Sequence, residues 1–347
     1  MIEWPHELSE LALNKEANEY RIDTTAQKLG EVLKSGSLAL FIGSGVSTAV
    51  GLPLWSDLNK KIVKKSPRIL HKEFPDLWSK IKDQLPKTGE LRKAGVEPLK
   101  LLDQIEQVCS LCDSMKEDHA GDKHKFIGTS QSWHYLVRQA LYGEDSTYSF
   151  EDMFFPELVS LCSLLIGGRR GRAREVITFN YDDLLENFLK LHGQLYEVVT
   201  PLPNKISPNH ATIFYHPHGY LPRKSNHFLG RSFLLLSRQS YEQKSPGLKY
   251  HRETWQKFIG WMLCVRVGLF VGISGNDRIL ERYFDEAYSL WNEQESRRPL
   301  AFVILVGHGY LPPKDWLSKR IVPLEFSSAT DVARFLTLTC QKAAELS

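Results

Sequence analysis

The chain has 347 residues, of which 42% are hydrophobic and 24% charged, as in ordinary globular proteins of one or two domains. Lysine and arginine number 44 against 41 aspartates and glutamates, so the formal net charge of +3 gives no case for direct nucleic-acid or membrane binding. Five cysteines in a long chain are too few and too scattered for a disulfide framework, which predicts a reducing compartment.

The beginning of the chain and its apolar runs predict a cytoplasmic protein. Met1–Glu10 is polar and carries acidic residues, unlike a signal peptide. The longest apolar run, Trp261–Ser274, is too short to span a bilayer and contains Arg266. We therefore expect no contact with a membrane.

The chain order of the predicted elements favours an α/β protein. Residues 1–36 predict one or two leading helices, and residues 59–143 predict a helical insertion or subdomain, because they lack any strand pattern. Short runs rich in aliphatic residues predict strands at 37–42, 175–179, 211–215, 233–236, 268–273, 300–306 and 321–326.

These runs are almost continuously hydrophobic, which is typical of strands buried on both faces. We therefore expect a Rossmann-like parallel sheet with helices on both faces, formed by residues 37–58 and 144–347. Cys109 and Cys112 form the single CxxC pair, lie on a predicted helix and have no second pair to complete a zinc site, so we expect both in the core.

The first predicted strand runs into a Gly/Ser loop. Gly43 and Gly45, one residue apart, let the backbone turn sharply and approach a diphosphate, and Ser44 and Ser47 add hydroxyl donors. We expect a helix N-terminus to follow and to favour an anion. Thr48 stands where a dinucleotide fingerprint has its third glycine, so the loop alone is equally consistent with a plain strand-to-helix turn.

Three further predicted strands also end in polar residues. Asn180 and Asp182 follow the second strand, His218 follows the third, and Ser274 and Asp277 follow the strand at 268–273. Each has a structural alternative, since Asn, Asp and Ser favour helix N-termini and a lone histidine is more often structural. Four such ends on one parallel sheet, however, favour a ligand site at its carboxyl edge.

In order and approximate spacing, these motifs resemble the sirtuin superfamily. The loop Gly43–Ser47 is similar to its Gly-Ala-Gly-x-Ser, and Gly51–Trp55 is similar to its Gly-Ile-Pro-x-Phe. Thr178–Asp182 resembles Thr-Gln-Asn-Ile-Asp, His218 with Gly219 resembles the catalytic His-Gly, and Gly272–Ser274 resembles Gly-Thr-Ser.

One departure refines the resemblance. Sirtuin deacylases carry a zinc module with two CxxC pairs, whereas residues 183–268 contain a single cysteine, Cys264. Asn180 followed by Tyr181 and Asp182 looks closer to the sirtuin-like (SIR2-like) NAD hydrolases of bacterial antiphage defence.

The resemblance implies an NAD⁺ glycohydrolase that cleaves the nicotinamide–ribose bond, acts by NAD depletion and needs no metal. It makes Asn180 and His218 the catalytic pair. It implies that the diphosphate, the adenosine side and the nicotinamide are held by further residues, which are Gly43, Ser44, Gly45, Ser47, Trp55, Asp57, Thr178, Asp182, Gly219, Gly272, Ser274 and Asp277. In that set Asp182 contacts the nicotinamide amide, and Gly272 and Ser274 the adenosine side.

Two other activities fit the same fold. One is an NAD-dependent protein deacylase or ADP-ribosyltransferase, against which the missing zinc module counts. The other is a noncatalytic assembly subunit that binds NAD or ADP-ribose, which has no need of both Asn180 and His218. Because constant NAD depletion would kill the host, we also expect control by homo-oligomerisation or by a protein partner such as an ATPase.

Overall fold

The computed structural model describes residues 2–87, 98–120, 130–143, 147–149, 151–200, 211–224, 234–236, 246–273, 278–291, 298–307 and 312–346. Within these ranges, seven parallel strands form one sheet in the order β3-β4-β2-β1-β5-β6-β7. The strands are β1 Leu38–Ile42, β2 Glu175–Thr178, β3 Tyr196–Val199, β4 Thr212–Tyr215, β5 Val267–Val271, β6 Ala301–Val306 and β7 Ile321–Phe326. The predicted Rossmann-like α/β class is confirmed.

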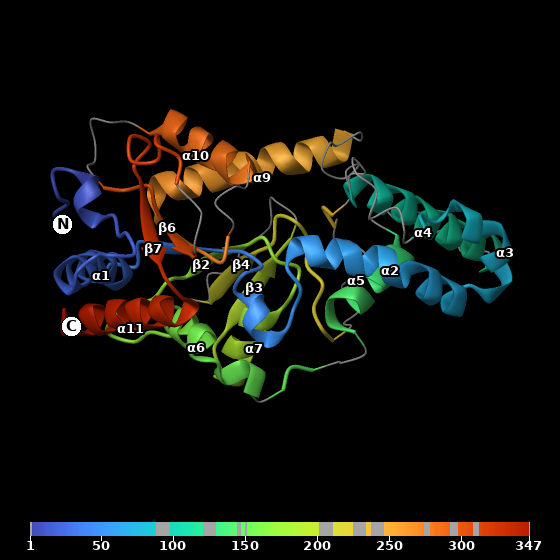
Figure 1. The fold of residues 1–347 in the computed structure, drawn as a ribbon, viewed down its shortest axis with the longest axis horizontal. Helices are drawn as coiled ribbons and strands as arrows, with labels where there is room; N and C mark the ends of the chain where they lie inside the picture. Colours follow the sequence, from blue (N-terminus) through green and yellow to red (C-terminus); the bar gives the residue numbers. More distant parts are fainter. Residues whose placement is uncertain are drawn as a thin grey trace.

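Helices cover both faces of this sheet (Figure 1). One face is covered by α1 Glu19–Lys34, α6 Pro156–Ser163, α7 Leu184–Leu191 and α11 Ala329–Glu345, and the other by α9 Pro246–Val265 and α10 Arg278–Leu290. Strand β1 is buried along its whole length, with Leu38, Leu40 and Ile42 in the first layer and Ala39 and Phe41 in the second. Its side chains alternate between the layers because successive residues of a strand point to opposite faces.

The two helices nearest the termini pack against each other. Asn18 caps α1 by accepting from the Arg21 N–H at 3.0 Å, and Ser328 caps α11 by accepting from the Asp331 N–H at 3.2 Å. Lys342 of α11 pairs with Asp23 of α1 at 2.7 Å. The chain ends therefore lie near each other on one side of the sheet (Figure 1).

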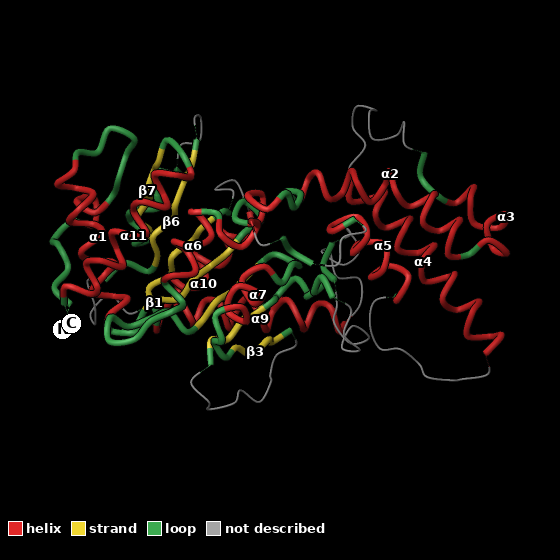
Figure 2. Tube along the Cα trace, turned by 90° about the horizontal axis from the view of Figure 1, so that it is seen from below, coloured by secondary structure: helices red, strands yellow, loops and turns green. Residues whose placement is uncertain are grey.

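A group of helices extends beyond the opposite side of the sheet, as both views show (Figures 1 and 2). They are α2 Trp55–Glu73, α3 Trp78–Ile81, α4 Pro98–Ala120 and α5 Gln131–Tyr142. They share a hydrophobic core that includes Ile62, Ile105 and Leu136 and contains the fully buried Cys109 and Cys112, as predicted for these cysteines. Their status as a separate domain over residues 59–143 stays a prediction.

Two strand assignments change. In the run predicted as a strand at 233–236, residues 234–236 are buried but form no strand, and Leu234 and Leu236 instead pack into the core of helices α2–α5. An apolar run indicates burial but does not by itself specify strand pairing. Conversely, β3 at Tyr196–Val199 was not predicted, because an edge strand is partly exposed and lacks the continuous apolar pattern.

No helix in the described part of the chain is long and apolar enough to cross a membrane.

Candidate active site

The strand register brings the predicted motifs to one edge of the sheet. Ile42, the last residue of β1, is in register with Thr178 of β2 and with Val271 of β5. Tyr215 of β4 is in register with Ile177 of β2. The segments that begin at residues 43, 179, 216 and 272 follow strands that are neighbours in the sheet, so these segments lie side by side. Their place is the point at which the strand order changes direction around β1, where sheets of this class bind ligands.

Three glycines allow the ends of β1 and β5 to touch. The Gly43 and Gly45 N–H groups donate to the carbonyls of Val271 and Gly272, both at 2.9 Å. A Cβ on Gly43 would lie 2.5 Å from the Gly272 carbonyl oxygen. Gly272 has a φ of +70°, and a Cβ there would meet the Val46 nitrogen at 2.6 Å. Contact between two backbone segments thus requires glycine at these positions.

The loop does not pass directly into an α-helix, contrary to prediction. Ser47–Val50 is one turn of 3₁₀-helix that ends at Gly51 with a φ of 75°, and α2 begins only at Trp55. The N–H groups of Val46 and Ser47 already donate to the carbonyls of Gly43 and Ser44, both at 3.1 Å. The loop therefore does not form the N-terminus of a long helix, and the favourable helix dipole expected there for an anion is absent.

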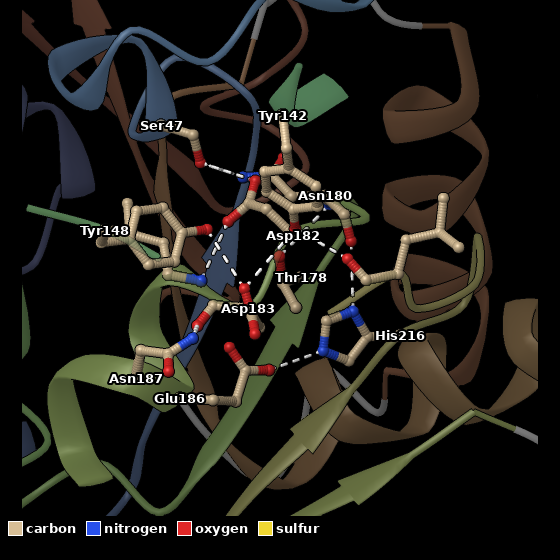
Figure 3. A network of polar contacts seen from close by, with 12 residues as sticks. Ser47, Tyr142, Tyr148, Thr178, Asn180, Asp182, Asp183, Glu186, Asn187 and His216 are labelled. Carbon is tan, nitrogen blue, oxygen red and sulfur yellow. Dashed lines mark hydrogen bonds and ion pairs between the residues drawn. The ribbon is translucent and has the colours of Figure 1, made fainter. Parts of the chain in front are cut away.

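The side chain of Asn180 is fixed by that loop (Figure 3). Its amide nitrogen donates to the Gly43 carbonyl at 3.1 Å and to the Ser47 hydroxyl at 3.0 Å. A carbonyl can only accept, so the nitrogen, and not the amide oxygen, must face Gly43. Both amide hydrogens are used in this way, which turns the amide oxygen of Asn180 elsewhere.

Asp182 continues this network. The Ser47 hydroxyl donates to Asp182 Oδ2 at 2.8 Å, and the Leu184 N–H at the start of α7 donates to Oδ1 at 3.2 Å. Burial raises the pKa of the Asp182 carboxyl to about 6, although both hydrogen bonds oppose this rise. Asp182 therefore accepts a hydrogen bond from the first turn of α7, the capping role considered as an alternative from the sequence, and it also binds the glycine loop.

His218 lies beside the residue that precedes Asn180. Its ring centroid is 5.2 Å from that of Phe179, and its side chain is hydrogen-bonded to the Phe179 backbone. Burial lowers the pKa of His218 to about 4, so the imidazole is neutral at pH 7. Gly219 follows with a φ of 109°, a backbone conformation suited to glycine. Asn180 and His218 thus share one edge, joined through Phe179.

The other predicted binding residues are less closely associated. Trp55 and Asp57 lie in the first turn of α2, where the exposed Asp57 pairs with Lys60 at 2.9 Å. Thr178 accepts from the Asn180 N–H at 3.2 Å and so belongs to the network. Ser274 and Asp277 lie outside the described residues.

One feature of the site was missed in the sequence. His216 and Glu186 form a fully buried pair, with Nε2 to Oε1 at 2.7 Å and exposed side-chain fractions of 0% and 2%. The other ring nitrogen of His216, Nδ1, is 3.1 Å from the Asn180 carbonyl oxygen. In the sequence, His216 stands two residues before His218, and nothing else marks it. Glu186 carried no signal, because a single glutamate within a helical pattern is ordinary.

A second missed feature connects helices α2–α5 to this edge. Tyr142, the last residue of α5, donates its hydroxyl to the Leu221 carbonyl at 2.7 Å. Tyr148 donates to Asp183 at 3.2 Å, and the Arg223 guanidinium lies 4.3 Å from the Tyr148 ring centroid. Burial raises the pKa of Asp183, an effect its hydrogen bonds oppose. The helices thus contact the segments that follow β2 and β4.

Among the described residues, no three or more histidine, cysteine or acidic side chains are grouped as metal ligands.

Comparison with known proteins finds a family match for part of the chain. No curated protein matches the chain. Residues 174–319, from the start of β2 to just before β7, match the family model of the SIR2-like domain. The matched segment contains Asn180, His216, His218 and Gly272, while the glycine loop precedes it. This match supports a SIR2-like assignment for the segment, and a SIR2-like domain implies the use of NAD.

Proposed function

We propose that the protein is an NAD⁺ glycohydrolase that releases nicotinamide and ADP-ribose. The observation that carries the proposal is the orientation of Asn180: its two amide hydrogens are bound by Gly43 and Ser47, so its amide oxygen is held ready as an acceptor. An acceptor at the carboxyl edge of a parallel sheet suits a ribose hydroxyl or a water molecule.

The chemistry needs little more than positioning. Water attacks C1′ of the nicotinamide ribose, the C1′–N bond breaks, and its electron pair leaves with a now neutral nicotinamide. The attacking water loses one proton, which His218 can accept because its imidazole is neutral at pH 7. The ring nitrogen that is not bonded to the Phe179 backbone is the accepting atom.

The low pKa of His218 limits what the imidazole contributes. A base with a pKa of about 4 binds a proton weakly, so its rate contribution belongs at the lower end of the usual ~10²–10⁴-fold. Most of the acceleration must come from holding the ribose and the water in place. The fixed amide of Asn180 supports that role.

We further propose that this activity depletes NAD in antiphage defence and is controlled by self-assembly or by a partner such as an ATPase. The resemblance of the Asn180–Asp182 segment to such hydrolases supports the first part. The Tyr142–Leu221 hydrogen bond supports the second, because it gives helices α2–α5 a direct contact with the site edge. A partner that moves these helices would reach the site through this contact.

Mass spectrometry of NAD⁺ after incubation with the purified chain tests the activity. We expect nicotinamide and ADP-ribose without any acyl-lysine peptide, and a loss of at least about 10²-fold in His218→Ala and Asn180→Ala. His192→Ala, at an exposed histidine of the same domain, is the matched control and should keep full activity. Full activity in either site variant contradicts the assignment. Turnover only with an acylated peptide favours a deacylase, and tight binding with no turnover favours a noncatalytic subunit.

A further inference from the structure

We propose that His216 and Glu186 are positioning residues that fix the main chain of Asn180 and thereby aim its amide oxygen. The inference rests on the proposed NAD cleavage, which it deepens by assigning the groups that orient Asn180. Both side chains are buried beneath the site and point toward each other in Figure 3.

The hydrogen-bond partners determine where a proton must lie. The Asn180 carbonyl oxygen can only accept, so His216 Nδ1, 3.1 Å away, carries a hydrogen and donates it. Nε2 and the Glu186 carboxyl, 2.7 Å apart, then share one further proton, whichever atom holds it. Glu186 therefore holds the ring of His216 from its Nε2 side, while Nδ1 donates to Asn180.

With this bond, Asn180 is held on every side but one. Its N–H donates to the Thr178 hydroxyl at 3.2 Å, and its carbonyl accepts from His216. Its amide nitrogen donates to Gly43 and Ser47 at 3.1 and 3.0 Å. In the described contacts, the amide oxygen is the one polar group of Asn180 without an assigned partner. A residue fixed by four bonds and left with one free acceptor is preorganised for a ligand.

A gain in folding stability does not by itself explain why His216 and Glu186 are paired in the interior. A buried ion pair loses the hydration of both partners, so an apolar pair of similar volume often stabilises a fold at least as well. Burial raises the pKa of Glu186, and His216 opposes this rise. The pair also lies near two further buried acids, Asp182 and Asp183, which adds to the electrostatic cost. Orientation of Asn180 is a function that an apolar pair would not supply.

Two amide substitutions at His216 separate the two hydrogen bonds. The amide nitrogen of Asn can take the place of Nδ1, so His216→Asn keeps the donor to Asn180 and loses Glu186. The amide nitrogen of Gln can take the place of Nε2, so His216→Gln keeps Glu186 and loses Asn180. We expect kcat to fall at most about 10-fold in His216→Asn and at least about 100-fold in His216→Gln, with KM within about 3-fold in both.

Two substitutions at Glu186 complete the test. A Gln amide can donate to Nε2 and so keep the hydrogen on Nδ1, which predicts near-normal kcat for Glu186→Gln. Glu186→Leu removes the hydrogen bond that holds the His216 ring at Nε2, so the ring can turn away from Asn180 and kcat should fall by about 100-fold. Equal losses of kcat in His216→Asn and His216→Gln, at equal thermal stability, would show a merely structural role and overturn the proposal.

A nuclear magnetic resonance measurement separates this inference from the proposed reaction. In protein with ¹⁵N-labelled histidine we expect Nδ1 of His216 to be protonated in the wild type, in Glu186→Gln and in His218→Ala, because the Asn180 carbonyl can only accept. An unprotonated Nδ1 in the wild type overturns the inference even if NAD is cleaved. If NAD is not cleaved but Nδ1 behaves as expected, the proposed reaction fails while the orientation of Asn180 stands.

Discussion

Ser47 donates its hydroxyl to Asp182 at 2.8 Å, although 135 residues separate the two in the chain. The bond joins the glycine loop after β1 to the start of α7 after β2, and the amide of Asn180 completes the bridge by donating to the same hydroxyl. A single buried hydroxyl therefore holds together two of the segments that define the candidate site.

Removing that hydroxyl should loosen the edge of the sheet. Ser47→Ala leaves Asp182 Oδ2 and one Asn180 hydrogen without their partner in a buried place, which we expect to cost about 1–3 kcal/mol of unfolding free energy. Ser44→Ala, at the half-buried neighbour, should change it by less than about 0.5 kcal/mol. Chemical denaturation measures both. Equal effects of the two substitutions would show that the hydroxyl network contributes nothing.

The contact between the ends of β1 and β5 predicts that alanine substitution costs different amounts of stability at two glycines of equal φ. Gly272 and Gly36 both have a φ of +70°, but a Cβ on Gly36 meets nothing within 4 Å. Gly36→Ala should cost the backbone strain alone, about 1–2 kcal/mol. Gly272→Ala should cost at least about 2 kcal/mol more, because its Cβ would overlap the Val46 nitrogen. Thermal unfolding of the two variants gives the comparison, and similar losses would contradict the close approach.

The lowered pKa of His218 predicts acid sensitivity. Below the ordinary pKa of about 6.5 the unfolded chain takes up a proton that folded His218, with a pKa of about 4, does not. Its contribution to stability is therefore complete above pH 6.5 and is lost as the pH falls from 6.5 toward 4, in total about 3 kcal/mol. His218→Gln should lack this part of the pH dependence, while His192→Gln should keep it. Unfolding free energies measured at several pH values decide this, and parallel curves for wild type and His218→Gln would refute it.

The raised pKa of Asp182 predicts that the unfolding free energy falls as the pH rises, the opposite of the effect of His218. Between its ordinary pKa of 3.8 and the folded value of about 6, the unfolded chain ionises while the folded carboxyl stays protonated. The unfolding free energy of the wild type should therefore fall by up to about 3 kcal/mol from this group as the pH rises from 4 to 6. Asp182→Asn should not show this loss, and Asp57→Asn, at an exposed carboxyl, should behave as the wild type. A constant difference between wild type and Asp182→Asn from pH 4 to pH 7 would contradict the prediction.

Local sequence patterns were enough to predict most of the sheet and the edge at which the candidate site residues lie. Strands β1, β2, β4, β5, β6 and β7 each carry a short apolar run, because burial on both faces leaves no room for polar alternation. The polar residues at the ends of four of these runs predicted the position of Asn180 and His218. The edge strand β3, which is partly exposed, escaped this reasoning, and the apolar run at 233–236 misled it.

The sequence by itself determined which side chains stand at the strand ends, since strand length and alternation are local properties. Only the tertiary structure decided their partners. Glu186 meets His216 across 30 residues and Tyr142 meets Leu221 across 79, because the register of parallel strands and the packing of helices select these pairs. A hydrogen bond requires two groups within about 3 Å. Local sequence patterns do not give the distance between residues far apart in the chain, because that distance depends on how the helices connecting the strands pack against the sheet.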